Sequence, residues 1–247
     1  MKNLENIKAI LFDADGTIID HKECEKQALK YLFENIGFKY KDEYQEIFRP
    51  LDRKLWDDVV FNRTLLKKED IPEYRFKIFF SKIQLNYSDY KNANTLFQDG
   101  LSQSSAIIKN ADIMMKYLYK KKFDLYVVTN GLVRLQKPRI TNSKISQFIK
   151  DIIVSEEVGE TKPNPKIFNV LLERYNLKPD NAVMIGDSLE KDIIGAKNAG
   201  IKSIWYNPNE KNNNIEIIPD YEIRDLLDLK EILDGSNEVW INKLWNM

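Results

Sequence analysis

Two carboxylates stand directly after a short apolar run near the start of the chain. Asp13 and Asp15 follow Ile7–Phe12, and Gly16 comes next. Carboxylates are established covalent nucleophiles in phosphoryl transfer, so Asp13 is a candidate nucleophile. An acid two residues further along a turn can reach the other side of the phosphorus, where Asp15 would protonate the leaving oxygen and later activate water. Gly16 would let the chain leave the strand sharply, and consecutive backbone N–H groups there could hold phosphate oxygens.

Polar residues follow the later apolar runs in the same way. Thr129 and Asn130 come after one run and Lys162 lies in the loop after the next; Asp187 follows a third, with Asp192 five residues further on. The carboxyl ends of parallel strands share one edge of a sheet, so these side chains can converge despite their wide separation in sequence. There Thr129 and Lys162 would place a hydroxyl and a cation against the charge that spreads over a transferring phosphoryl group.

Carboxylates gathered at one sheet edge repel one another, and a bound cation is one remedy. Hard oxygen ligands next to a phosphate suit Mg²⁺, which would neutralise the repulsion between Asp13 and an incoming phosphate dianion. Each residue taken singly has an ordinary explanation, because Asp-Gly and Lys-Pro pairs are common in turns and loops. Their joint occurrence, in order and each after a strand signal, favours a Mg²⁺-dependent phosphoryl-transfer site.

Alternating elements are predicted to position these residues. Short, nearly continuous apolar runs are typical of strands buried on both faces of a parallel sheet. They are Ile7–Phe12, Phe123–Val128, Asp151–Val154, Ala182–Ile185 and Lys202–Tyr206. Helical periodicity lies between the later runs, over Ala111–Tyr119 and Lys166–Tyr175. Strands that alternate with helices predict an α/β fold with a doubly wound parallel sheet.

One long interval breaks the alternation. No convincing strand lies between Gly16 and Ser105, although a strand-to-helix connection usually needs only ~2–6 residues. The interval holds four helical stretches, approximately 23–36, 42–61, 71–85 and 88–103. We therefore predict a helical cap domain over residues 19–103, inserted into an α/β core formed by residues 1–18 and 104–247. The insert would lie over the carboxyl edge of the sheet, where ligands bind.

The composition narrows the chemistry and the partners. The 247 residues carry a formal charge of zero, one cysteine and one histidine. Cys24 alone cannot form an internal disulfide, and His21 alone leaves little material for a histidine-rich zinc site or a Ser-His-Asp triad. Balanced charge and short apolar runs argue against a nucleic-acid polymer or a membrane as a partner. We predict a cytoplasmic protein, monomer or homodimer, that binds a small-molecule phosphate monoester.

Four segments resemble the motifs of the haloacid dehalogenase (HAD) superfamily, in particular subfamily I with a helical cap. They are Asp13–Thr17, Val128–Asn130, Lys162–Pro163 and Gly186–Asp192. The resemblance implies a Rossmann-like core with a cap inserted after the first motif, and the roles given above to Asp13, Asp15, Thr129 and Lys162. It also implies that Mg²⁺ is held by three groups, with two further side chains in support. These are Asp13, the backbone carbonyl of Asp15 and Asp187, supported by Ser188 and Asp192.

A narrower resemblance is to the housecleaning pyrimidine 5′-nucleotidases, which act on nucleoside monophosphates. It rests on Thr129–Gln136, Val154–Gly159, Lys162–Phe168 and, in the cap, Lys54–Trp56. It implies that a nucleoside 5′-monophosphate contacts Gly16, Thr17, Asn130, Gly131, Arg53 and Trp56. Two positions depart from the pattern. Pro138 is expected to kink or end the helix after Asn130, and Asp52 places an extra negative charge where asparagine is expected.

Other functions remain open at this point. A phosphosugar phosphatase or mutase would share the cap type and both aspartates. A 2-haloacid dehalogenase needs no metal and lacks an acid at the position of Asp15, and a non-catalytic phosphate-binding protein should have lost a motif. In the cap, Arg49 and Phe97 could also face a nucleotide, although Trp56 and Phe97 fit equally well as cap core. The tail Ser236–Met247 is expected to form a short helix on the core.

Overall fold

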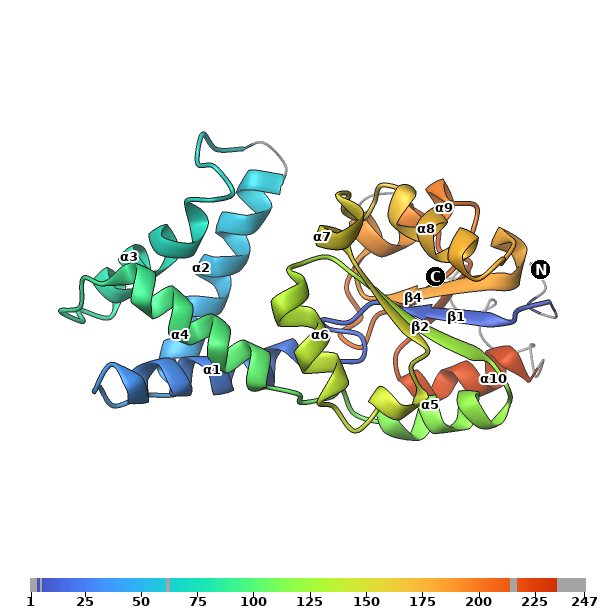
Figure 1. Ribbon diagram of the computed structural model, residues 1–247, viewed down its shortest axis with the longest axis horizontal. Helices are drawn as coiled ribbons and strands as arrows, with labels where there is room; N and C mark the ends of the chain where they lie inside the picture. The colour runs from blue at the N-terminus through green and yellow to red at the C-terminus, as the bar shows by residue number, and fades with distance from the viewer. Residues whose placement is uncertain (1–3, 5, 61–62, 214–216, 235–247) are drawn as a thin grey trace. The chain divides into compact units, whose positions relative to one another are not determined.

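The computed structural model describes residues 4, 6–60, 63–213 and 217–234 (Figure 1). The helix expected over Ser236–Met247 therefore lies outside the described residues. The chain divides into two compact units, one made of residues 1–20 and 105–247 and the other of residues 21–104. Each unit has its own helices and its own core, and each is described by itself below.

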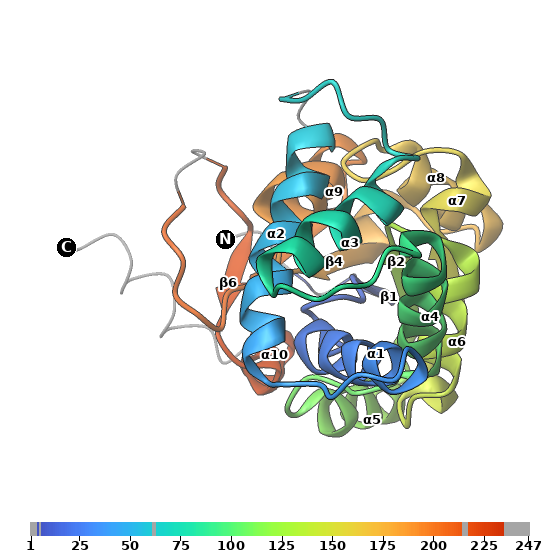
Figure 2. The same ribbon diagram turned by 90° about the vertical axis from the view of Figure 1, so that its left-hand side faces the viewer.

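The first unit is built on a six-stranded sheet in which every pair of neighbouring strands is parallel. Its order is β3-β2-β1-β4-β5-β6. The strands are β1 Ala9–Phe12, β2 Asp124–Thr129, β3 Asp151–Val154, β4 Ala182–Gly186, β5 Lys202–Tyr206 and β6 Tyr221–Ile223. The predicted α/β fold with a doubly wound parallel sheet is confirmed. The sequence did not reveal β6, which is only three residues long and pairs with β5 at the edge of the sheet (Figure 2).

Helices cover both faces of this sheet. They are α5 Ala111–Lys120, α6 Val133–Thr141, α7 Ser155–Val158, α8 Lys166–Arg174, α9 Ile194–Asn198 and α10 Leu229–Leu233. Figure 1 shows α8 and α9 on one face and α5 and α10 on the other. The expected early break at Pro138 is not found, because α6 continues to Thr141, whose hydroxyl donates to the carbonyl of Lys137 at 2.8 Å.

The register of the central strands brings the motif segments to one edge. Every residue of β1 and of β4 is buried, which explains why these runs are apolar without alternation. Phe12 pairs with Val127 of β2 and with Ile185 of β4. The residues that follow these positions therefore emerge together, and the backbone N–H of Asp13 donates to the Ile185 carbonyl at 2.9 Å.

The second unit is a helical cap. It contains α1 His21–Asn35, α2 Glu43–Val60, α3 Ile71–Lys82 and α4 Tyr90–Gln103. Its core is a cluster of buried rings from all four helices, which include Phe33, Phe48, Phe76, Phe79 and Phe97. The part of the chain that the structure describes contains no helix that is both long and apolar enough to cross a membrane.

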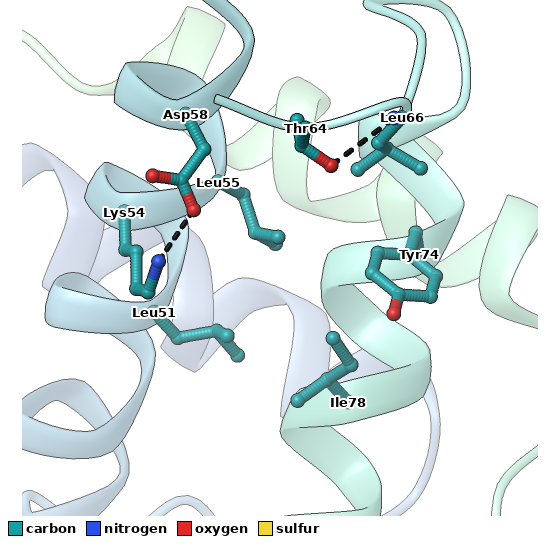
Figure 3. A pocket seen from close by; sticks show the side chains of 8 residues that line it. All are labelled: Leu51, Lys54, Leu55, Asp58, Thr64, Leu66, Tyr74 and Ile78. Carbon is teal, nitrogen blue, oxygen red and sulfur yellow. Dashed lines mark hydrogen bonds and ion pairs between the residues drawn. The ribbon is translucent and has the colours of Figure 1, made fainter. Parts of the chain in front are cut away.

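A hollow of about 480 Å³ lies within the cap between α2 and α3 (Figure 3). On α2 it is lined by one helical face, and Figure 3 shows side chains of α3 directed toward that face. The lining residues are Leu51, Lys54, Leu55, Asp58, Thr64, Leu66, Tyr74 and Ile78. The opposite face of α2 carries Arg49, Arg53 and Trp56. The hollow is therefore separate from the face that is expected to bind a substrate.

Gly100 lets α1 and α4 approach closely within the cap. A Cβ atom at this position would lie 2.8 Å from Cα of Ala28 and 3.0 Å from Cβ of Tyr31. The first contact is with backbone, which cannot rotate away as a flexible side chain would. The close packing of these two helices therefore requires glycine at this position.

We expect Gly100→Ala to lower the free energy of unfolding by about 1–3 kcal/mol, because the overlap outweighs the better helix propensity of alanine. Urea unfolding checks this. Asp99→Ala is the control, since Asp99 is exposed on the same helix; its effect should stay within about 0.5 kcal/mol. An unchanged urea midpoint for Gly100→Ala would show that the two helices can separate without cost.

Candidate active site

A buried lysine joins three segments at the carboxyl edge of the sheet. The Lys162 ammonium donates to Asp13 Oδ1 at 2.6 Å, to Asp192 Oδ1 at 2.7 Å and to the Val128 carbonyl at 2.8 Å. An ammonium has three donors, so this group is fully satisfied. Only 4% of Lys162 is exposed. The structure therefore brings together Asp13, Lys162 and Asp192, as the sequence predicts from their positions after separate strands.

The charges of this cluster act on one another. Burial lowers the pKa of Lys162, but the adjacent Asp13 and Asp192 outweigh it and raise the pKa above its usual range. Burial also raises the pKa of Asp13 well above that of an ordinary aspartate; Lys162 opposes this effect, while the negative charges of Asp192 and Asp187 add to it. Lys162 is therefore held as a cation, and the site is short of positive charge for its carboxylates.

Three of these carboxylates could share a metal ion. One oxygen from each of Asp13, Asp187 and Asp192 lies within 4.8 Å of the others. The donors are hard oxygens, and the repulsion that raises the pKa of Asp13 is what a divalent cation would relieve. Asp192 is already committed on both oxygens, because Oδ1 accepts from Lys162 and Oδ2 accepts from the Ser188 backbone N–H at 3.0 Å. These carboxylate oxygens fit Mg²⁺. Because both oxygens of Asp192 already accept hydrogen bonds, Asp192 is better placed to orient the neighbouring groups than to bind the ion directly.

Two glycines make room for these carboxylates. A Cβ atom at Gly186 would lie 2.3 Å from Asp192 Oδ2, so no other residue fits there without displacing Asp192. Gly16 has φ +88°, and a Cβ atom there would lie 3.0 Å from Asp187 Oδ2. The segment after β4 then forms a π-helix over Leu189–Ile193, a feature frequently found at functional sites. These close approaches place Asp187 against the turn after β1 and Asp192 against the end of β4.

Asn130 ties the loop of the lysine to the end of β2. Its side-chain amide donates to the Lys162 carbonyl at 3.1 Å, and its Oδ1 accepts from the Lys162 backbone N–H at 2.8 Å. Thr129 is buried, and its hydroxyl donates to the Asn130 carbonyl at 3.3 Å. The Gly131 backbone N–H donates to the Ser155 hydroxyl at 3.0 Å. This set therefore stabilises the site by joining β2 to the loop that carries Lys162.

Asp15 has partners that the sequence did not identify. Its carboxylate accepts from both terminal nitrogens of the Arg139 guanidinium and from the Gln136 amide, and both of these residues lie on α6. The spacing of three residues places Gln136 and Arg139 on one helical face. This spacing is the only feature of the sequence that could have suggested that they share a partner. Thr17 is wholly buried, and its hydroxyl has no hydrogen-bond partner among the described residues.

The cap candidates belong to the second unit. Arg53 is exposed and Trp56 is half-buried on α2. Phe97 lies in the aromatic core, 5.1 Å from the ring centroid of Phe48. The extra charge of Asp52 is compensated inside the cap, because its carboxylate accepts from Arg75 at 3.0 Å. Asp52 therefore adds no unpaired negative charge to this unit.

Comparison with known proteins agrees with this geometry. A family model described as haloacid dehalogenase-like hydrolase matches residues 10–206. The HAD-hydrolase YfnB of Bacillus subtilis is 32% identical over 237 residues, which cover 96% of this chain and 99% of that protein. The crystal structure of YfnB bound to magnesium has a TM-score of 0.84 and 33% identity, and the match covers 93% of this chain and 100% of that one.

Two further relatives carry names of enzymes that act on phosphate esters. The pyrimidine 5′-nucleotidase PynA of Streptococcus pneumoniae is 29% identical over 233 residues, covering 93% of this chain and 96% of that protein. The glyceraldehyde 3-phosphate phosphatase of Pyrococcus furiosus is 28% identical over 246 residues, covering 95% of this chain and 96% of that protein. The similarity thus extends over both units.

The raised pKa of Asp13 leads to a prediction about stability. Above its pKa in the folded state, ionised Asp13 disfavours folding, and this penalty fades as the pH falls toward the ordinary aspartate pKa of ~3.9. Asp13→Asn should therefore raise the free energy of unfolding at pH 7 in Mg²⁺-free buffer, and raise it by less at pH 4.5. Urea unfolding at both pH values measures the difference.

The control for this prediction is Asp124→Asn. Asp124 begins β2 at the opposite end of the strand and forms a half-exposed ion pair with Lys150 at 2.9 Å. It should not gain stability at pH 7. If Asp13→Asn were less stable than the wild type at pH 7, attraction to Lys162 would outweigh both burial and the repulsion from the other carboxylates.

Proposed function

This chain belongs to the haloacid dehalogenase-like hydrolases, and we propose that it is a Mg²⁺-dependent phosphatase that hydrolyses a phosphate monoester through an aspartyl-phosphate on Asp13. The observation that carries the proposal is the Lys162 ammonium bound to both Asp13 and Asp192 at the edge of the sheet. It holds a carboxylate nucleophile next to a permanent cation. Two named phosphatase relatives, which match along the whole chain, support the same reaction class.

In the first step Asp13 attacks phosphorus, and the bond between phosphorus and the ester oxygen breaks. Asp15 gives its proton to that leaving oxygen, so the product leaves as a neutral alcohol. Lys162 offsets the negative charge that Asp13 and the phosphoryl oxygens bring together. The Thr129 hydroxyl and the backbone N–H groups around Gly16 would bind the phosphoryl oxygens.

In the second step water attacks the phosphorus of the aspartyl-phosphate. Asp15, now ionised, removes a proton from this water, and the bond between phosphorus and the Asp13 oxygen breaks. Inorganic phosphate leaves, Asp13 is regenerated as a carboxylate and Asp15 again holds a proton. One residue thus acts as acid in the first step and as base in the second.

The residues that would hold Mg²⁺ are Asp13, Asp187 and the backbone carbonyl of Asp15. When bound, the ion supplies charge neutralisation between Asp13 and the phosphate dianion. Asp192 and Ser188 would support this site, since the Ser188 backbone N–H and the Lys162 ammonium together fix the orientation of the Asp192 carboxylate. The relative YfnB has been crystallised with bound magnesium, which supports Mg²⁺ as the ion of this site.

Asp15 favours phosphoryl transfer over dehalogenation. A carbon–halogen bond breaks to release a halide, which needs no proton, whereas an alkoxide leaving from a phosphate ester does. Asp15 is present and its carboxylate is held in place by α6. A non-catalytic phosphate-binding role would give no reason to keep both the nucleophile and this acid, and all four motif segments are intact.

For the substrate, we infer a nucleoside 5′-monophosphate of a pyrimidine. The relative PynA is named a pyrimidine 5′-nucleotidase, and its match covers 93% of this chain. Arg53 and Trp56 share one helical face of α2, where a guanidinium and a ring can bind and stack on a base. Arg49 lies on the same face, and its guanidinium is 3.8 Å from the buried Glu25 carboxylate. Because Arg75 compensates Asp52, the departure at that position does not argue against this substrate. The second candidate is a small phosphosugar or triose phosphate, which the Pyrococcus relative favours.

Phosphate release tests the proposal. We expect Mg²⁺-dependent release from UMP, dUMP or dTMP in preference to glyceraldehyde 3-phosphate and hexose phosphates. Asp13→Asn should lose at least about 10³-fold in kcat, because the covalent route then has no nucleophile. A preference for sugar phosphates would reassign the substrate and keep the chemistry. Substantial activity of Asp13→Asn would exclude the aspartyl-phosphate.

Metal binding can be measured without turnover. A ligand that binds only the folded state raises its stability by RT ln(1 + [L]/Kd), about 2.7 kcal/mol at 100 times Kd. Mg²⁺ should therefore raise the Tm of the wild type, and Asp187→Asn should remove most of this shift. Asp124→Asn, at the far end of the sheet, should keep it. An equal shift in Asp187→Asn and the wild type would place the ion elsewhere.

A further inference from the structure

Asp15 is bound by three hydrogen-bond donors from a single helix. Arg139 donates through Nη2 to Oδ1 at 2.6 Å and through Nη1 to Oδ2 at 3.2 Å, while the Gln136 amide donates to Oδ2 at 2.8 Å. A two-pronged guanidinium contact fixes both the position and the plane of a carboxylate. The third donor adds a further constraint on Oδ2. The Asp15 side chain is therefore held in one defined orientation.

The two donors are themselves firmly placed. Gln136 and Arg139 are buried, with 6% and 2% of each residue exposed, whereas 27% of the Asp15 side chain is exposed. Gly131, with φ +141°, leaves room for Gln136, since a Cβ atom there would lie 3.0 Å from its Nε2. The same Nε2 lies 3.3 Å from the carbonyl of Asn130. The donors thus belong to the packed interior, whereas the Asp15 side chain remains partly exposed.

The contacts of Asn130 connect these donors to the catalytic lysine. Asn130 binds the backbone of Lys162 through both ends of its side-chain amide, and its carbonyl accepts from Gln136. A continuous set of hydrogen bonds therefore runs from the Lys162 loop through Asn130 and Gln136 to Asp15. These hydrogen bonds fix the position of Asp15 relative to the Lys162 ammonium, which contacts Asp13.

A purely structural role is a weak explanation for this arrangement. Burying an arginine beside a carboxylate costs desolvation free energy, and the attraction between the two charges often only offsets this cost. Apolar residues of the same volume would pack equally well and would avoid the cost. Such an ion pair is better explained by the need for one defined side-chain position. Asp15 is the group whose position the proposed reaction requires in both of its steps.

We propose that Gln136 and Arg139 are positioning residues that hold the Asp15 carboxylate in line for proton transfer to the leaving oxygen and from the attacking water. The inference rests on the proposed function, in which Asp15 is the general acid and base. Neither side chain needs to touch the substrate for this role. Their loss should slow proton transfer and leave phosphate binding largely intact.

Variants at Arg139 and Gln136 test this role. Arg139→Met removes the two guanidinium nitrogens that donate to Asp15 and keeps a long side chain. Arg139→Lys keeps the positive charge but cannot make the two-pronged contact. Gln136→Met removes the third donor. The matched control is Arg174→Met, which breaks a surface ion pair with Asp151 at 2.7 Å in the same unit. Substrates are a nucleoside monophosphate, whose leaving alkoxide needs a proton, and 4-nitrophenyl phosphate, whose leaving group needs far less help.

For Arg139→Met we expect kcat with the nucleotide to fall by about 10²-fold and KM to change by less than about threefold, since misplaced proton transfer slows the chemistry and not binding. The loss in kcat/KM, which reports the first step, should be about tenfold smaller with 4-nitrophenyl phosphate than with the nucleotide, a difference that a general loss of folding would not produce. The kcat values of Arg139→Lys and Gln136→Met should lie between those of Arg139→Met and the wild type. Arg174→Met should match the wild type with both substrates.

Equal losses in kcat/KM with the two substrates, or a kcat within about twofold of the wild type, would overturn the inference, because positioned general acid–base catalysis contributes far more than that. If Arg139→Met does not fold, Arg139→Lys and Gln136→Met decide by the same comparison of substrates. A wild-type protein that releases no phosphate from any substrate would instead overturn the proposed function, and this inference with it. The two failures are therefore distinguishable.

Discussion

The core of this protein depends on one buried ammonium group. Lys162 donates to Asp13, to Asp192 and to the carbonyl of Val128, so it joins the ends of β1 and β2 with the π-helix after β4. A buried cation is tolerated only when its donors are satisfied and its charge is balanced, and here three acceptors meet three donors. The parallel sheet makes this possible, since its register brings strand ends from distant parts of the chain to one edge.

The same arrangement leaves the site with more negative than positive charge. Asp13 lies close to Asp187 and Asp192, and burial together with their charges raises its pKa in spite of Lys162. Glycines at positions 16 and 186 permit this crowding, because a side chain there would overlap the carboxylates. The excess negative charge destabilises the folded state, and a bound divalent cation would relieve this repulsion. Stability and reactivity are therefore opposed at Asp13, as is common at catalytic centres.

The two units divide the tasks of the molecule. The α/β unit contains every residue to which we assign chemistry, and there α6 supplies the donors that orient Asp15. The cap has an aromatic core of its own and balances its internal charges, as the pairing of Arg75 with Asp52 illustrates. A family can keep one reaction and change its substrate when the residues for each lie in separate units. The differing names of the relatives fit this division.

Much of this could be read from the sequence, because strand periodicity and motif order are local signals. The five apolar runs, the helical insert and the positions of Asp13 and Asp187 directly after strands were predicted in this way. Thr129 was expected just after its strand and is instead the last residue of β2, and α7 separates Lys162 from β3. Pro138 was expected to kink or end the helix after Asn130, and the helix does not end there, since α6 continues to Thr141. Strand β6 was missed, because three residues at a sheet edge carry too little pattern to detect.

Long-range contacts required the tertiary structure. Sequence patterns did not predict that Gln136 and Arg139 bind Asp15, more than 120 residues away, or that Arg75 compensates Asp52. Nor could they decide whether Phe97 belongs to the cap core. These contacts depend on which helix faces meet after folding. The sequence by itself thus determined the class of chemistry and the order of the elements, whereas the tertiary structure decided which side chains hold the reacting groups, because partners of buried polar groups are chosen by packing and not by local spacing.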